Sequence, residues 1–242
     1  MLFSDLSLSR RLERAEGQAC VQFAEVRRTR FPDSGAEWME CAGAYAVFDG
    51  VDSPVTQTFG LGLFEPLSPD SLDAIERFFL DRGAQVCHEV SPFAGIATLD
   101  LLCARQYRPM EISNVLYRPV EKPPAAEHGN IRVRVTGAAD AQLWSQISAK
   151  GWTHEHPELR EFVERSGALA AARPQSPCFL AELDGQPGAA GALFIDNGVA
   201  LFGGAWLALP CQTKPAVAVA ARIRPRKRYV RRMRGLLPKG DR

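Results

Sequence analysis

The sequence has no apolar run long enough to cross a membrane. Its longest apolar stretch, residues 198–210, is shorter than the roughly 20 residues that a transmembrane helix needs. Near the N-terminus, Asp5 and the Arg10-Arg11 pair come before any apolar segment of the kind found in secretory signal peptides. We therefore expect a cytoplasmic protein with no membrane partner.

Cysteine and histidine do not occur in the patterns of metal sites or disulfide scaffolds. The six cysteines are far apart, with no C-x-x-C pair and no Cys/His spacing suited to zinc. We expect free, buried thiols, because disulfides rarely persist in a reducing compartment. A nucleophilic cysteine would need a neighbouring base, and the sequence favours none of the six. No metal site is predicted.

What the sequence does contain is typical of a soluble globular chain with one unusual end. Its 242 residues are 46% hydrophobic and 24% charged, which suits one large domain or two small ones. From Leu207 to Arg242 there are eleven Lys or Arg residues and one acid, a net charge of +10. The whole chain has a net charge of +1, so the rest carries −9. This shift separates a basic tail, residues 207–242, from an acidic body.

Residues 1–119 show the patterns of an α/β unit. The expected order is helix, strand, strand, helix, strand, helix, strand, over residues 5–29, 38–48, 56–63, 68–83, 84–90, 96–106 and 110–117. The best local signal is Ser68-Pro69, since Ser is a good N-cap and Pro suits the first helical position. The Pro-rich, polar segment 120–130 is typical of a linker.

A second unit is expected over residues 131–206. It begins with an alternating strand over 131–135, followed by helices over 138–150 and 157–172. Three strands then lie within CFLAELDGQPGAAGALFIDNGVALFGGAW, residues 178–206. Asp184-Gly185 and Asp196-Asn197-Gly198 predict tight hairpin turns, because Asn and Gly tolerate the positive φ that such turns need.

This order of elements resembles the first half of the GNAT superfamily of acetyl-CoA-dependent N-acetyltransferases, most clearly in FLAELDGQPGAAGALFIDNGVALFGGA. The first unit looks like a diverged second copy. Its segment LLCARQYRPMEI resembles the family's closing elements, with Gln106 where the family commonly has Gly. The resemblance implies an α/β fold of two GNAT-like units, each a mixed, mostly antiparallel sheet flanked by helices, the second incomplete.

The resemblance also implies a site for acetyl-CoA. In the family, the fourth strand exposes backbone groups to the pantetheine arm, and it corresponds here to Val199, Ala200, Leu201, Phe202, Gly203 and Gly204. The family's strand then enters an R/Q-x-x-G-x-G/A turn at a helix N-terminus, where N–H groups hold the pyrophosphate. The alternative interpretation of residues 199–204 is a plain core strand.

The expected phosphate-binding turn does not follow Trp206. The segment Arg232-Met233-Arg234-Gly235 has the R-x-x-G spacing, but Leu237 follows where a small residue is needed and Pro238 leaves no room for the helix. The acid that protonates the CoA thiolate, commonly Tyr, also has no segment to carry it. One hypothesis is a reading-frame change near Trp206 that truncates an ancestral acetyltransferase. Another is a disordered basic arm that binds polyanions nonspecifically.

A polar loop between the two helices of the second unit holds the other candidates. In Trp152-Thr-His-Glu-His-Pro157, the resemblance places the loop beside the acceptor pocket. Glu155 is a weak candidate for the catalytic base, and both Trp152 and Glu155 would contact the substrate. The alternative is a solvated polar loop with a buried Trp.

We therefore expect a GNAT-like N-acetyltransferase that transfers an acyl group to a small-molecule or peptide amine. Without a phosphate-binding turn, acetyl-CoA should bind weakly or not at all, and the chain would be inactive. The alternative is a non-catalytic binding protein, either a pseudoenzyme or a polyanion-binding adaptor. The uncharged strand 199–205 would be an exposed edge, so we also expect self-association.

Overall fold

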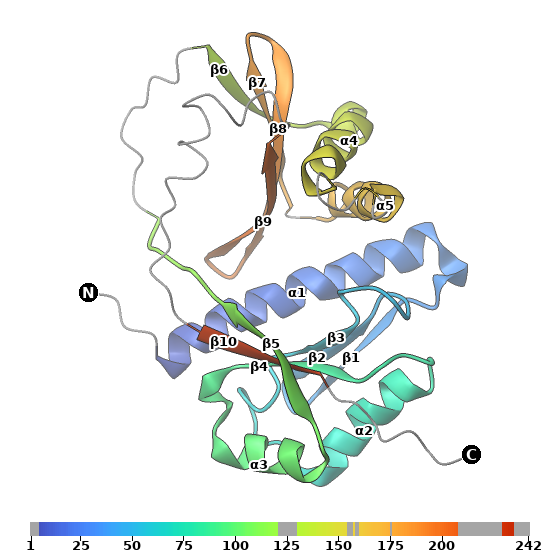
Figure 1. The fold of residues 1–242 in the computed structure, drawn as a ribbon, viewed down its shortest axis with the longest axis vertical. Helices are drawn as coiled ribbons and strands as arrows, with labels where there is room; N and C mark the ends of the chain where they lie inside the picture. Colours follow the sequence, from blue (N-terminus) through green and yellow to red (C-terminus); the bar gives the residue numbers. More distant parts are fainter. Residues whose placement is uncertain are drawn as a thin grey trace. The chain divides into compact units, whose positions relative to one another are not determined.

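The computed structural model describes residues 5–120, 130–153, 157, 160–174, 176–207 and 229–234. The chain forms two compact units, Met1–Leu116 with Lys227–Arg242, and Tyr117–Arg226 (Figure 1). Each unit has its own β-sheet with flanking helices, which confirms the expected α/β class. No helix among the described residues is both long enough and apolar enough to span a bilayer.

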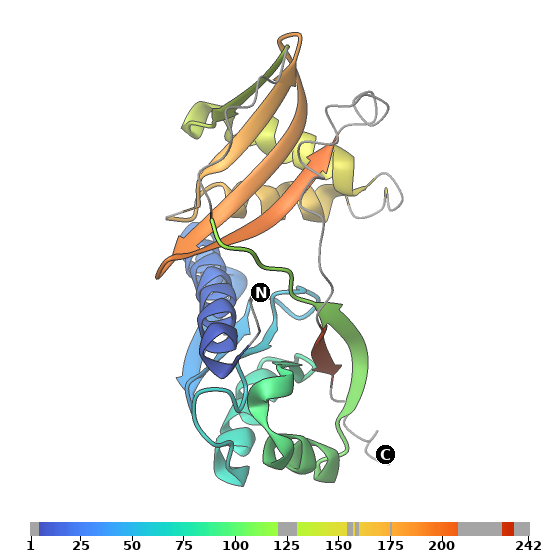
Figure 2. The same ribbon diagram turned by 90° about the vertical axis from the view of Figure 1, so that its left-hand side faces the viewer.

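The first unit is a six-stranded sheet with helices on both faces. Its elements are α1 (Leu6–Arg30), β1 (Glu37–Cys41), β2 (Ala44–Phe48), β3 (Gln57–Phe59), α2 (Pro69–Leu80), β4 (Cys87–Val90), α3 (Ile96–Ala104), β5 (Arg108–Asn114) and β10 (Tyr229–Arg234). The strand order is β1-β2-β3-β4-β10-β5, and only the β3–β4 pair is parallel. One face of the sheet is covered by α1 and the other by α2 and α3 (Figure 1, Figure 2).

Local capping explains where α1 and α2 begin. Asp5 accepts a hydrogen bond from the Leu8 N–H (2.7 Å) and caps α1. Ser68 accepts from the Ser71 N–H (3.1 Å), and Pro69 is the first residue of α2. The start predicted from Ser68-Pro69 is therefore confirmed. After α3, Gln106 adopts φ +64°, the left-handed conformation for which glycine is the usual residue.

One expected strand is in fact a hairpin. Residues 38–48 were expected to form a single strand, but β1 and β2 pair antiparallel through a two-residue turn. Ala42 and Gly43 in this turn have φ of +50° and +72°, as a type I′ turn requires. Alanine rarely takes a positive φ, so Ala42-Gly43 gives no turn signal in the sequence.

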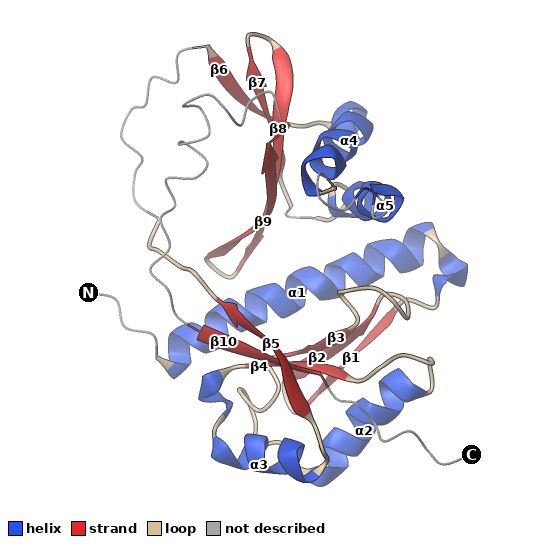
Figure 3. Ribbon diagram, viewed as in Figure 1, coloured by secondary structure: helices blue, strands red, loops and turns tan. Residues whose placement is uncertain are grey.

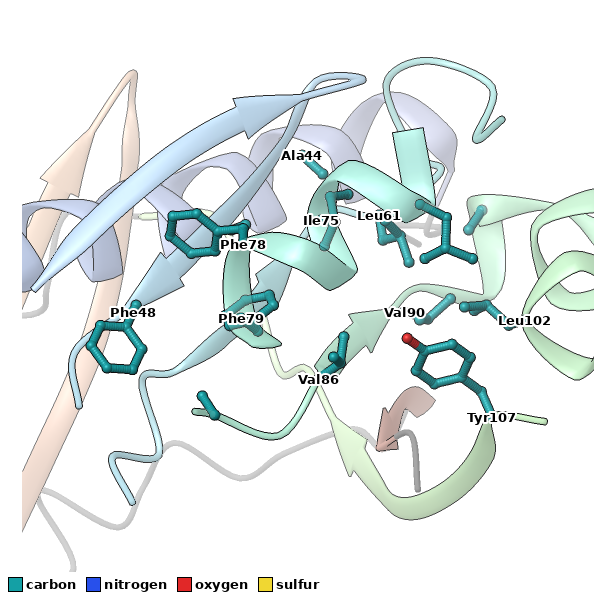
Figure 4. Close-up of a cluster of buried hydrophobic side chains, with 14 residues drawn as sticks. Ala44, Phe48, Leu61, Ile75, Phe78, Phe79, Val86, Val90, Leu102 and Tyr107 are labelled. Carbon is teal, nitrogen blue, oxygen red and sulfur yellow. The ribbon is translucent and has the colours of Figure 1, made fainter. Parts of the chain in front are cut away.

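The largest core lies between the sheet and the two helices α2 and α3 (Figure 3). Figure 4 shows Ile75 and Phe79 of α2 in this cluster, with Phe79 on the side of Val86 and with Val90 of β4 next to Leu102 of α3 and Tyr107. Ile75 and Phe79 belong to the apolar face of the amphipathic helix α2, and burial of the whole cluster supplies the main stabilising contribution to the unit. Leu61, from the loop after β3, is also fully buried there.

The described part of the second unit is an antiparallel sheet with two helices. Its elements are β6 (Ile131–Val135), α4 (Ala141–Trp152), α5 (Arg160–Ala170), β7 (Cys178–Leu183), β8 (Gln186–Asp196) and β9 (Val199–Leu207), with strand order β6-β7-β8-β9. Both predicted hairpin turns are present, at Asp184-Gly185 and Asn197-Gly198, with positive φ at all four residues. Trp144, Leu180 and Ala190 pack in the core between the helices and the sheet.

The C-terminal strand differs from the expectation of a disordered tail over 207–242. Tyr229–Arg234 forms β10, which pairs antiparallel with β4 on one side and β5 on the other. Both partner strands, β4 and β5, are far from β10 in the sequence, so no local pattern indicates these pairings. The predicted unit 1–119 is therefore completed by a segment from the other end of the chain, whereas residues 121–129 of the predicted linker and 208–228 of the tail lie outside the described residues.

Candidate functional site

All six residues expected to bind the pantetheine arm lie on β9. Among the described strands, β9 pairs only with β8, so it forms an edge of the sheet in that part of the chain. Val199 and Leu201 are half-buried, whereas Ala200 and Phe202 are exposed. The side chain alternation matches a strand with one face on the core and one face open.

The backbone of Phe202 points toward this open edge. Its partner on β8 is Leu193, whose N–H donates to the Pro177 carbonyl (3.0 Å) on the β7 side. In an antiparallel sheet, the N–H and C=O groups of one residue point to the same side of its strand. Because those of Leu193 point toward β7, Leu193 forms no backbone hydrogen bonds with Phe202, its partner on β9. The N–H and C=O of Phe202 therefore point away from β8, where an extended ligand could pair with them.

A β-bulge interrupts the ladder beyond Phe202. The register shifts between Ala190 and Ala192 of β8, where the two β9 residues Gly204-Ala205 face Gly191 alone. A bulge leaves one residue outside the ladder and bends its strand. On the opposite strand, the buried Trp144 of α4 donates its indole N–H to the Gly191 carbonyl (3.1 Å). The irregularity is thus fixed against a rigid helix.

The expected acceptor-site residues are described only in part. Trp152 is the last residue of α4, but its side chain lies outside the described residues, as does Glu155. The helices on either side of their loop pack closely, since the Ser145 hydroxyl of α4 donates to the Glu164 carbonyl of α5 (2.5 Å). The roles of Trp152 and Glu155 therefore stay predictions.

A complete R/Q-x-x-G-x-G/A pattern lies elsewhere in the chain, far from its expected place after Trp206. Gln57-Thr58-Phe59-Gly60-Leu61-Gly62 matches it at every defined position and lies in the first unit, at β3 and the turn after it. Gly60 and Gly62 both have positive φ, +75° and +68°. β3 and β4 share one pair, Thr58 opposite His88, so the parallel strands separate directly afterwards. The spacing of Gln57, Gly60 and Gly62 is the only signal that the sequence offers for this motif.

Buried ionisable groups lie beside this β3–β4 pair. Burial raises the pKa of the Glu13 carboxyl on α1 to about 8, and the charge of Glu89 on β4 adds to the effect. Burial lowers the pKa of His88 to about 3, so its imidazole is neutral near pH 7. Among the described residues, no group hydrogen-bonds to either ring nitrogen of His88, which packs against Tyr107 (4.9 Å between ring centroids).

Other chemistry finds little support in the described residues. They contain no cluster of His, Cys, Asp or Glu able to hold a metal ion. The five described cysteines are free thiols, and burial raises the pKa of Cys178, which disfavours its reactive thiolate form. Of the R-x-x-G segment in the tail, Arg232 to Arg234 belong to β10, and the residues after Arg234 lie outside the described residues.

Comparison with known proteins gives a fold. No family model and no curated protein matches the sequence. Among solved structures, the chain is similar to a GCN5-related N-acetyltransferase from Kribbella flavida, with 15% identity, a TM-score of 0.58 and coverage of 96% of each chain. The chain has a GNAT fold.

Two further solved structures are similar over most of their length. One is the C-terminal (DUF2156) domain ascribed to a lysylphosphatidylglycerol synthetase from Agrobacterium fabrum, with 10% identity, a TM-score of 0.45 and coverage of 90% of this chain and 92% of that one. The other is a tandem GNAT protein from the clavulanic acid biosynthesis pathway, with 12% identity, a TM-score of 0.43 and coverage of 93% and 96%.

Proposed function

We propose that this protein is an N-acyltransferase that binds acetyl-CoA along β9 and transfers its acyl group to an amine. The observation that carries the proposal is the edge of β9, where the backbone of Phe202 is directed away from β8 and a bulge follows at Gly204-Ala205. The GNAT fold supports it, because in that fold the corresponding strand receives the pantetheine arm.

The residues of β9 suit such a ligand. Pantetheine is an extended chain with two amides, and an edge strand offers it alternating N–H and C=O groups in the manner of a neighbouring strand. Residues 199–207 carry no charge, so an uncharged ligand arm could lie along this edge without displacing water from a charged side chain. The charged half of CoA would have to be held by residues after Leu207, which lie outside the described residues.

Acetyl-CoA supplies an activated thioester. In the proposed arrangement, the backbone N–H groups at the bulge donate to the thioester oxygen, which gains negative charge when an amine attacks its carbon. Glu155 accepts the proton that the amine loses, and Trp152 orients the acceptor beside the strand. The carbon–sulfur bond of the thioester then breaks, so the acyl group stays on the amine as an amide and CoA leaves as a thiolate. The acceptor is a small-molecule or peptide amine.

The alternative is a non-catalytic protein that binds polyanions through its basic C-terminal residues. Its support is the net charge of +10 over residues 207–242. Such binding falls steeply with salt, because it releases counter-ions from the polyanion. A heparin affinity that disappears at moderate salt, without any acetyl-CoA binding, would favour this alternative over the acyltransferase.

Calorimetric titration of the full-length chain with acetyl-CoA, extended to millimolar concentration, tests the main proposal. Phe202→Pro removes one edge N–H without breaking a bond to β8, and edge strands tolerate proline. Phe202→Ala removes the same side chain but keeps the N–H. We expect Phe202→Pro to weaken binding about tenfold, or about 1.4 kcal/mol, relative to Phe202→Ala.

Circular dichroism of both variants checks that the fold is intact. The proposal fails if the wild-type chain binds no acetyl-CoA at millimolar concentration. It also fails if folded Phe202→Pro and Phe202→Ala bind equally well, because the ligand would then not use the backbone of β9.

A further inference from the structure

The glycines of the first unit's Gln57–Gly62 motif face packed side chains. A Cβ at Gly60 would lie 2.7 Å from the ring of Phe64, and a Cβ at Gly62 would lie 2.3 Å from the hydroxyl of Thr98 on α3. Non-bonded atoms do not approach this closely, so Phe64 and Thr98 can occupy their positions only because Gly60 and Gly62 have no Cβ. In the direction that a side chain would take, the space beside both glycines is occupied by protein.

Phe64 is held in this position from three sides. Its Cβ lies 2.6 Å from the position that a Cβ at Gly43 would take, in the β1–β2 turn. The guanidinium of Arg14, on α1, lies 3.9 Å from the centroid of its ring and 4.7 Å from that of Tyr45 on β2. Arg14 is itself paired with Glu40 on β1 (3.1 Å). Cation–π contacts and the ion pair thus fix Phe64 against α1 and the hairpin.

The turn between the glycines is also anchored. Arg10, one turn before Arg14 on α1, donates its Nε–H to the Leu63 carbonyl (2.7 Å). Leu63 donates its N–H to the Gly60 carbonyl (3.1 Å), which closes the turn. Leu61 and Leu63 are 0% and 1% exposed, and Figure 4 shows Leu61 directed into the core beside Ile75. Each residue of the turn therefore has a structural contact.

The helix that follows the motif is not free to bind an anion. Of its first four residues, Ser71 donates its N–H to the Ser68 hydroxyl, Leu72 donates to the Ser68 carbonyl, and Pro69 has no N–H to offer. Asp70 lies in the first turn of α2, and Glu65 is exposed in the loop before it. Two carboxylates beside the helix N-terminus would repel a pyrophosphate.

We propose that the Gln57–Gly62 motif is a structural latch and not a phosphate-binding loop. Phe64 fills the space over Gly60, and the turn ties α1, the β1–β2 hairpin and α3 together. The first unit therefore binds no CoA, and the chain takes at most one CoA molecule. This inference concerns the first unit alone and does not depend on acetyl-CoA binding to β9.

Hydrogen–deuterium exchange of the full-length chain, with and without millimolar CoA, tests the latch. Phe64→Ala opens the space over Gly60, whereas Phe93→Ala removes a ring that is 41% exposed in the same unit and serves as the matched control. We expect Phe64→Ala to speed exchange about tenfold in residues 60–64 and in the facing turn of α1, and Phe93→Ala to leave both unchanged. CoA should not alter exchange of residues 57–64 in the wild-type chain.

Two results would overturn the latch. Saturable slowing of exchange at residues 60–63 by CoA in the wild-type chain would show a phosphate-binding loop. Equal exchange in Phe64→Ala and Phe93→Ala would show that Phe64 holds nothing in place. Protection of residues 199–207 is recorded in the same experiment, so failure of the β9 proposal is read separately from failure of the latch.

Discussion

Each unit contains a glycine-rich segment, directly after β3 in the first unit and within β9 in the second, and the surroundings of the two segments differ. In the first unit, Gly60 and Gly62 adopt positive φ and lie against Phe64 and Thr98. In the second, Gly203 and Gly204 lie in an edge strand, where a bulge interrupts the only ladder that the described strands form with β9. The first unit's glycines admit neighbouring side chains of the protein itself. The glycines of β9 lie in a strand whose outward-facing N–H and C=O groups have no neighbouring strand among the described residues.

This contrast shows what a glycine motif indicates and what it does not. Glycine marks a place where something approaches the backbone closely. Whether that partner is a phosphate, a strand or an aromatic ring depends on residues outside the motif. Here Phe64, only two residues beyond Gly62, decides the question for the first unit.

The largest expected effect comes from deleting residues 227–242. β10 lies between β4 and β5, so its loss leaves two strand edges unpaired inside the first unit's sheet. We expect the first unit to lose more than about 4 kcal/mol of stability, measured by urea unfolding. The second unit should keep its exchange protection, and equal loss in both units would contradict the division into units.

A smaller effect is expected from Gly62→Ala. Gly62 and Gly83 have nearly the same φ, +68° and +69°, but nothing lies within 4 Å of a Cβ at Gly83. Gly83→Ala should therefore cost only the backbone strain, about 1 kcal/mol. Gly62→Ala should cost about 3 kcal/mol, because Thr98 must also move. Chemical denaturation of both variants measures the difference. Equal losses in the free energy of unfolding would mean that Thr98 can move aside without destabilising the fold.

The pH dependence of stability should come partly from Glu13. Its pKa is about 8 in the folded chain and near 4.5 when unfolded, so the folded state binds the proton more tightly. Stability should therefore fall as pH rises from about 4.5 to about 8, by at most about 1.4 kcal/mol per pH unit. Glu13→Gln should flatten this decline in thermal unfolding curves. An unchanged slope in that variant would place the titrating group elsewhere.

The smallest effect is expected from removing single indole hydrogen bonds. Trp144→Phe leaves the Gly191 carbonyl opposite the bulge without its donor and should destabilise the second unit by about 1–2 kcal/mol. Trp38→Phe removes a bond to Glu25 in the first unit, where both side chains are only half-buried, and should cost about 0.5 kcal/mol. Unfolding followed by exchange in each unit compares the two, and a larger cost for Trp38→Phe would contradict this ranking.

Local signals predicted much of the fold. The Ser68-Pro69 helix start and the turns at Asp184-Gly185 and Asn197-Gly198 are all present, because capping and positive φ are decided by the residues themselves. The hairpin at Ala42-Gly43 was missed because alanine gives no turn signal. β10 was missed because its partners lie more than a hundred residues away, and a strand's pairing cannot be derived from its own pattern.

The candidate site was predicted only as a strand. The turn at Asp196-Asn197-Gly198 and the apolar residues after it indicated its position, but the direction of the Phe202 backbone and the bulge at Gly204-Ala205 follow from the register with β8. A register is a property of two strands together. Likewise, the motif at Gln57 could be read from the sequence, whereas the ring that fills it could not.

Photolabelling with an acyl-CoA that carries a diazirine in its acyl chain tests the central claim most directly. The label reacts with whatever lies beside the bound acyl group, and peptide mass spectrometry locates it. We predict labelling within residues 199–207 that excess acetyl-CoA suppresses, and none within residues 57–64. Suppressible labelling of residues 57–64, with none on β9, would contradict the assignment of the cofactor site to the second unit.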